Sequence, residues 1–164
     1  MGGQTGFENS LHIDMRAFNQ VLELDTKRKQ VTVQSGIVWR DLQKVIDREN
    51  LSVKIMQTYA NFTVGGSVSV NCHGRYIGHG PIISSVVRMK LITAQGDVLT
   101  VSREENDALF RAAIGGYGGI GVIAEVTLEL ADNVKVERRT ELIDAKDYVS
   151  YFNENIRHDT TVIF

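Results

Sequence analysis

The sequence has one cysteine and one proline among its 164 residues. A single thiol, Cys72, cannot form an internal disulfide, and no CxxC pair is present to bind zinc or to carry out dithiol chemistry. No apolar run approaches the roughly 18 residues that a membrane-spanning helix needs, and the first residues lack the basic-then-apolar pattern of a secretory signal. These absences predict a protein without a transmembrane segment in a reducing, cytoplasmic setting.

Charge of one sign is also scarce. The 18 Lys and Arg residues are nearly balanced by 20 Asp and Glu residues, which gives a net charge of -2 without a long single-sign run. A phosphate backbone or an anionic membrane attracts concentrated positive charge, so no nucleic-acid partner is expected. The 43% hydrophobic content is sufficient for the core of one domain, or of one domain plus a small attachment.

Hydrophobic periodicity predicts strands that alternate with a few helices. Strands are expected at 11–15, 21–24, 31–34, 86–93, 97–102, 122–130, 134–142 and 160–164, with hairpins around 25–29 and 94–96. Apolar residues at spacings of three and four predict helices over 38–48, from about 106 to 114, and over 147–155. Ser35 or Gly36 is expected to cap the first of these helices, and Asn106 or Asp107 the second.

Two glycine clusters are candidates for ligand contact. Gly116 to Gly121 matches the pattern G-x-G-x-x-G, which in a dinucleotide fold follows a strand and opens a helix. Here a helix is predicted before the glycines and a strand after them, which disfavours a nicotinamide site of the Rossmann type. A helix terminus explains only some of these glycines, so backbone lying close against a ligand is the better interpretation.

The cluster at Gly65 and Gly66 follows an extended segment, and a short helix is expected from Ser67 onward. Freed backbone N–H groups at such a turn can hold a pyrophosphate without a cation, and no Lys or Arg occurs between Lys54 and Arg75. A tight structural turn would have the same spacing. Local pattern alone therefore leaves both interpretations open.

Cys72 and His73 are adjacent, which raises the question of a nucleophile and base pair. Neighbouring side chains on an extended backbone point to opposite faces, so the two cannot easily cooperate. A metal site would need His12 or His79 together with carboxylates at no recognisable spacing, and no metal is expected. Cys72 is predicted to be buried and apolar, whereas His73 either faces a ligand or is a loop histidine with a backbone partner.

Taken in order, several segments resemble the FAD-binding (PCMH-type) domain of the vanillyl-alcohol oxidase and p-cresol methylhydroxylase flavoprotein superfamily. Their order and spacing match from about residue 2 to residue 130. Within the superfamily the sequence is most similar to the branch of the aldonolactone oxidases and the decaprenylphosphoryl-ribose oxidase, in which His-Gly follows Thr-Val-Gly-Gly. The segments that carry the resemblance are 33–42, 63–66, 71–74, 91–99, 109–116 and 118–122.

The resemblance implies an α+β fold in which two α/β subdomains hold an extended FAD and a cap domain covers the flavin ring. Residues 1–132 would form a partial FAD-binding domain, and residues 133–164 would begin the cap. The first phosphate loop of the family is represented only by its tail, Met1 to Gln4, so the domain is expected to be truncated at its N-terminus. The fragment alone would then bind FAD weakly or not at all and would be inactive.

The resemblance also assigns the expected FAD contacts. Residues 63–66 would hold the pyrophosphate, residues 70–73 would run beside the ribityl chain and ring, and residues 121–123 would contact the ring or the adenine. No catalytic residue is assigned, and a cysteine for a second flavin bond is absent just before Gly65. The full set of expected contacts is Thr58, Thr63, Val64, Gly65, Gly66, Ser67, Val70, Asn71, Cys72, His73, Gly74, Gly121, Val122 and Ile123.

The resemblance further implies an FAD-linked oxidoreductase. Its small-molecule substrate would be an alcohol in a sugar, lactone or polyol, oxidised by hydride transfer to flavin N5. The main alternative is a non-catalytic or degenerate flavin-binding module used in assembly or regulation. A nicotinamide-dependent dehydrogenase that uses the second glycine cluster is a further alternative.

Overall fold

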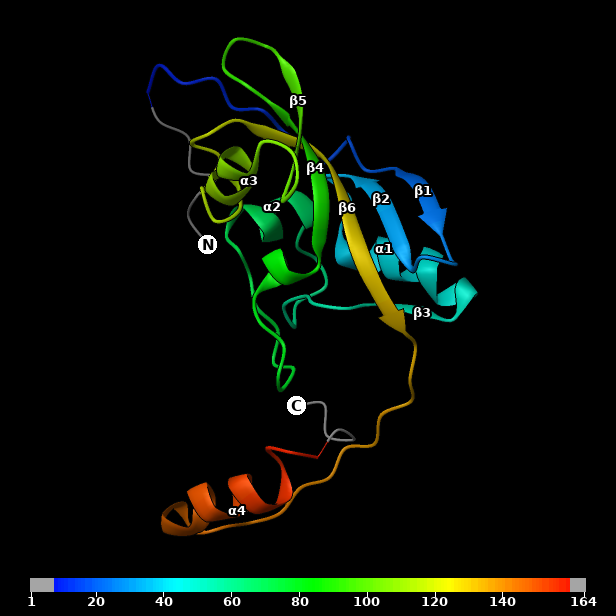
Figure 1. The fold of residues 1–164 in the computed structure, drawn as a ribbon, viewed down its shortest axis with the longest axis vertical. Helices are drawn as coiled ribbons and strands as arrows, with labels where there is room; N and C mark the ends of the chain where they lie inside the picture. The colour runs from blue at the N-terminus through cyan, green and yellow to red at the C-terminus, as the bar shows by residue number, and fades with distance from the viewer. Residues whose placement is uncertain (1–7, 160–164) are drawn as a thin grey trace.

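A sheet of six strands with helices against one face forms the centre of the computed structural model, which describes residues 8–159 (Figure 1). The strands are β1 (Val21–Asp25), β2 (Gln30–Gln34), β3 (Leu51–Val53), β4 (Val86–Ile92), β5 (Val98–Ser102) and β6 (Val122–Asp132). The helices are α1 (Trp39–Ile46), α2 (Val64–Ser69), α3 (Asp107–Ala113) and α4 (Tyr148–Asn155). Helices combined with an antiparallel sheet confirm the predicted α+β class.

The central strand is β6, and its side chains alternate between the two faces of the sheet. The strand order is β1-β2-β6-β4-β5, and β3 pairs with the far end of β6. Val126 lies opposite Val33 on one side and Met89 on the other, and all three are buried. Thr127 and Thr32, one position along, point to the opposite face and share a hydrogen bond of 2.9 Å. One face is therefore apolar and the other polar.

Helix α1 covers part of the apolar face because its apolar residues recur every three or four positions. Trp39, Leu42 and Ile46 are fully buried. Phe110 of α3 is also fully buried in the same hydrophobic cluster. Full burial of side chains of this size contributes about 1.5 to 3 kcal/mol each, so these helices are held by packing onto the sheet.

The structure confirms most of the predicted elements. Both hairpins form, as β1 with β2 and as β4 with β5, and the three predicted helices correspond to α1, α3 and α4. The predicted strand at 160–164 lies outside the described residues.

Two predicted strands are wrong, those at 11–15 and 134–142, because neither segment forms a strand. Their apolar residues are exposed, with Leu11 at 87% and Val136 at 62%. An alternating pattern forms a strand only where a neighbouring strand can pair with it.

The cap predicted for α1 at Ser35 or Gly36 is wrong, because tertiary contacts replace it, whereas Asn106 occupies the N-cap position of α3 as predicted. Helix α1 has Val38 at its N-cap without a side-chain hydrogen bond, and the amides of Trp39 and Arg40 donate to the carbonyls of Phe62 and Ala60. At α3 the side chain of Asn106 makes no capping bond and donates to the carbonyl of Thr100 instead. The segment just before α2 thus completes the first turn of α1.

Beyond β6 the chain leaves the sheet, and Figure 1 shows α4 set apart from the strands. Strand β6 ends at Asp132, and no strand or α-helix occurs between it and α4. The domain boundary after residue 132, the two subdomains and the beginning of a cap domain stay predictions. None of the described helices combines the length and apolar character that spanning a membrane requires.

Cys72 belongs to the hydrophobic core, as its sequence context predicts. Its side chain is 9% exposed, and burial raises the pKa of the thiol to about 11 from an ordinary value of 9.0. The thiol is therefore protonated at neutral pH. A buried neutral thiol is a packing group rather than a nucleophile.

We expect Cys72 in the native protein to react with iodoacetamide at pH 8 about a hundredfold more slowly than a free thiol, because little thiolate forms and access is limited. Peptide mapping after timed alkylation measures the rate, and the same protein in guanidinium provides the control. A native rate equal to the unfolded rate would contradict the burial.

Since the pKa is higher in the folded state, the thiol's contribution to stability is complete below about pH 9 and is lost as the pH rises through about 11.

Candidate functional site

Helix α2 begins where Thr63 caps it. The Thr63 Oγ1 atom accepts a hydrogen bond from the Gly66 amide at 3.1 Å, and the helix starts at Val64 rather than at the predicted Ser67. A Cβ at Gly65 would lie 2.6 Å from the Cβ of Ser35. Only glycine allows α2 to approach the turn between β2 and α1 so closely.

The backbone amides at the start of α2 already have acceptors. Val64 donates to the Ile37 carbonyl at 2.8 Å, and Gly65 donates to the Ser35 carbonyl at 2.7 Å. Ser67 donates to the Thr63 carbonyl at 3.0 Å. The expectation of freed N–H groups at this turn is therefore wrong. Only Gly66, which is exposed and bonded to a side-chain hydroxyl, can change its partner without breaking a backbone pair.

The second glycine cluster lies against the end of α2. The Gly115 amide donates to the Val68 carbonyl at 3.1 Å, and the Tyr117 amide donates to the Ser69 carbonyl at 3.0 Å. Tyr117 has φ of 52°, an uncommon conformation for a bulky residue, and its side chain is 66% exposed. Among the described residues, the amides of Gly118 and Ile120 donate no hydrogen bond. This loop therefore presents free backbone donors beside α2.

The order of elements around this loop excludes the Rossmann alternative. Helix α3 ends at Ala113, before the glycines, and β6 begins at Val122, directly after them. No helix N-terminus therefore follows the loop to receive a pyrophosphate. The nicotinamide-dependent interpretation of the motif is removed.

The turn after α2 separates Cys72 from His73, as predicted. Cys72 points into the core, whereas His73 is exposed. The His73 Nδ1 atom lies 2.9 Å from the Gly74 carbonyl oxygen, and because a carbonyl only accepts, Nδ1 is the donor. Asn71, in the left-handed conformation at φ of 46°, accepts a hydrogen bond from the Ile83 amide at 3.3 Å. A Cys and His catalytic pair is excluded.

The predicted contact residues divide into an accessible group and a buried group. Whether they contact FAD stays a prediction, but burial decides which side chains can do so directly. The side chains or backbone of nine residues reach the surface: Thr58, Thr63, Gly66, Val70, Asn71, His73, Gly74, Gly121 and Val122. Five are buried: Val64, Gly65, Ser67, Cys72 and Ile123.

Sequence reasoning missed a buried polar cluster behind α2. The Trp39 Nε1 atom donates to Ser67 Oγ at 2.8 Å and lies 3.2 Å from Gln57 Oε1. Gln57 Nε2 also donates to Ser67 Oγ, at 2.8 Å. The signal was a tryptophan on the apolar face of α1, because a buried indole N–H needs an acceptor. The sequence does not show which residue is that acceptor, because Ser67 lies 28 residues further along the chain.

The wall formed by α2 and the second glycine loop has the character that an extended, polar cofactor requires. It combines small residues, the exchangeable Gly66 amide and the free amides of Gly118 and Ile120. Ser35 Oγ, beside Gly65, is buried without a hydrogen-bond partner among the described residues. Within residues 8–159 no group of three or more His, Cys, Asp or Glu side chains is arranged to hold a metal ion.

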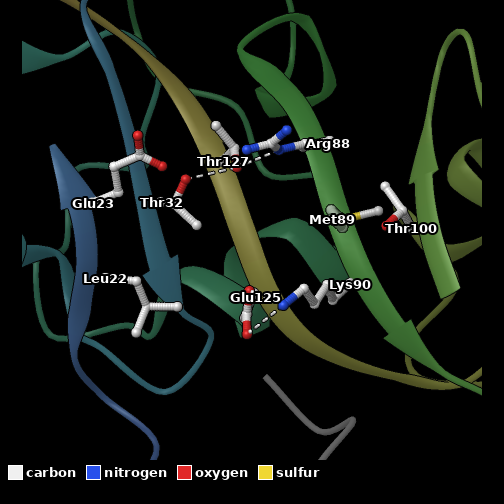
Figure 2. A pocket seen from close by; sticks show the side chains of 9 residues that line it. All are labelled: Leu22, Glu23, Thr32, Arg88, Met89, Lys90, Thr100, Glu125 and Thr127. Carbon is white, nitrogen blue, oxygen red and sulfur yellow. Dashed lines mark hydrogen bonds and ion pairs between the residues drawn. The ribbon is translucent and has the colours of Figure 1, made fainter. Parts of the chain in front are cut away.

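A separate hollow of about 390 Å³ lies on the polar face of the sheet, away from the helices (Figure 2). There Lys90 pairs with Glu125 at 3.0 Å, and Arg88 Nε lies 3.4 Å from Thr127 Oγ1. None of the predicted FAD contacts lines this hollow. Charges of both signs alternate across it, which is typical of a solvated sheet face.

The chain is similar to lactone oxidases and dehydrogenases. It is 32% identical over 145 residues to L-gulonolactone oxidase of Bos taurus, covering 88% of this chain and 33% of that protein. It is 38% identical to L-gulonolactone oxidase of Mus musculus over 117 residues, which cover 71% of this chain and 27% of that protein. It is 34% identical to the mitochondrial L-galactono-1,4-lactone dehydrogenase of Arabidopsis thaliana over 149 residues, which cover 91% of this chain and 23% of that protein.

These relatives agree with the aldonolactone branch to which the sequence is similar, and the chain spans about a quarter to a third of their lengths. The mitochondrial label of the plant relative gives no support to the cytoplasmic setting expected from the sequence. The family described as FAD binding domain matches residues 1–102, which include β1 to β5 and α2. By this match the chain belongs to the FAD binding domain family.

Proposed function

We propose that this chain forms one wall of the FAD site of an oxidoreductase that oxidises a CH–OH group in a sugar-derived lactone or a similar alcohol. The observation that carries the proposal is the meeting of the two glycine segments. Gly115 and Tyr117 donate to the carbonyls of Val68 and Ser69, so segments about 50 residues apart form one surface of small residues. The names of the relatives supply the substrate class.

The wall would hold the diphosphate with neutral donors. The Gly66 amide and the Thr63 hydroxyl now bond to each other at 3.1 Å, and both can turn to a phosphate oxygen. The free amides of Gly118 and Ile120 offer further donors from the second loop. Because no Lys or Arg lies between Lys54 and Arg75, directional hydrogen bonds rather than ion pairs would fix the cofactor here.

A bound flavin would supply the two-electron acceptor, taking a hydride from the alcohol carbon. The residues of this chain would orient that group, because Asn71 and His73 lie on the turn after α2 and the half-buried Val70 directly precedes them. The group that accepts the hydroxyl proton is expected from another part of the protein.

We expect the full-length protein to bind FAD and its flavin absorption band to bleach when an aldonolactone is added without oxygen, because substrate oxidation reduces the flavin. Visible spectroscopy during a titration with FAD, followed by anaerobic addition of a lactone panel, tests both steps. A series of alditols, added in the same way, is the comparison that shows whether bleaching requires a lactone or any sugar alcohol. Absence of flavin bands at saturating FAD would contradict the site itself.

The same experiment separates the alternative of a non-catalytic module. Binding of FAD without bleaching by any lactone or alcohol would favour a structural or regulatory role. The relatives are named as oxidases and dehydrogenases, which does not favour that alternative.

Thr63 provides a prediction for the exchange of hydrogen bonds. Thr63→Val removes the hydroxyl, so we expect FAD binding to weaken about tenfold and the free energy of unfolding to fall by about 1 kcal/mol, the usual contribution of a helix cap. Thr63→Ser keeps the hydroxyl and is the matched control. Fluorescence titration with FAD and urea unfolding measure the two effects. Equal FAD affinity in both variants would show that Thr63 does not contact the cofactor.

A further inference from the structure

The Ser67 hydroxyl is turned away from the wall and is fully buried. It accepts hydrogen bonds from Trp39 Nε1 and Gln57 Nε2, both at 2.8 Å, and donates to the Thr63 carbonyl at 2.8 Å. One donor and two acceptor positions are the complete capacity of a hydroxyl group. Ser67 therefore has no remaining bond for a cofactor.

These three bonds join α1, the loop that contains Thr58 and the start of α2. Trp39 belongs to α1, and Gln57 directly precedes Thr58 on the exposed loop. The Ser67 carbonyl accepts the Cys72 amide at 3.0 Å, immediately before His73. One residue thus connects α1, the loop of Thr58 and the turn of His73.

Resting on the proposed FAD site, we propose that Ser67 is a positioning residue. Its hydroxyl fixes the loop of Thr58 and the first turn of α2 relative to each other, and its carbonyl fixes the turn of His73. The bond from the Trp39 indole is buried and the other two hydroxyl bonds are partly buried, so they hold a single geometry more firmly than exposed bonds would. The wall is in this way set before the cofactor binds, which lowers the ordering cost of binding.

Ser67→Ala removes the hydroxyl and leaves Gln57 Nε2 without its acceptor, while the apolar core is retained. We expect residues 39–40, whose amides donate to the carbonyls of Phe62 and Ala60, and residues 63–69 to exchange amide hydrogen about tenfold faster in the FAD-free protein, because their shared anchor is lost. We also expect the Kd for FAD to rise about tenfold. Hydrogen-deuterium exchange by mass spectrometry and a flavin fluorescence titration of the full-length protein measure the two effects.

Ser150→Ala is the control, because Ser150 is an exposed helical serine on α4, outside the wall, and its hydroxyl has no hydrogen-bond partner among the described residues. It should leave exchange and FAD affinity unchanged. Gln57→Ala breaks the same cluster from a half-buried loop position, so it provides the test if Ser67→Ala does not fold. It should accelerate exchange at residues 39–40, whose amides donate to the carbonyls of this loop, and it should also weaken FAD binding.

The outcomes separate the two proposals. A wild-type protein that binds no FAD overturns the proposed function, and the positioning role with it. A wild-type protein that binds FAD, with Ser67→Ala or Gln57→Ala binding it equally well, overturns the positioning role alone. Faster exchange confined to 63–69 in Ser67→Ala would also overturn it, because the hydroxyl would then stabilise only its own helix.

Discussion

The close contact between α2 and the turn that follows β2 is the constraint on which the rest of the wall depends. The Gly65 amide donates to the Ser35 carbonyl at 2.7 Å, and no space remains there for a Cβ atom. Because α2 is held at this distance, the carbonyls of the preceding segment can accept hydrogen bonds from the amides in the first turn of α1. The same position places Ser67 over Trp39. A larger residue at Gly65 would disturb all three contacts together.

This packing also determines how the wall can recognise a cofactor. The amides that hold α2 against Ser35 and Ile37 are used for structure and cannot bind phosphate as well. In the proposed FAD site, recognition would therefore fall to the exposed Gly66 amide with its Thr63 partner and to the second glycine loop. Rigidity and binding are therefore assigned to different residues of one short helix. Such a division fits a cofactor that stays bound, because the wall need not reorganise around it.

The sequence predicts the parts of the fold in which local pattern and tertiary contacts agree. Alternating apolar residues predict β6 correctly, because neighbouring strands pair with it on both sides. The similar alternation at 134–142 has no partner strand and forms no strand. The positions of the glycine segments were predictable from their order. The acceptors of the Gly65 amide and the Trp39 indole were not, because both lie about 30 residues away in the chain. The sequence alone therefore cannot show which backbone N–H groups of a turn have acceptors elsewhere in the fold and which remain free for a ligand.

Strand β6 explains why the two glycine segments meet. It begins at Val122, directly after the second loop, and the carbonyl of Ala124 accepts the Ser35 amide at 2.9 Å. Ser35 in turn holds Gly65, so the first and second glycine segments are both positioned from the same end of one central strand. From this end β6 pairs with β4 starting at Val122 and with β2 starting at Glu125, and a shift of register would move apolar side chains to the polar face. The geometry of the wall is therefore fixed by the pairing of the sheet, and the glycine loops need little stability of their own.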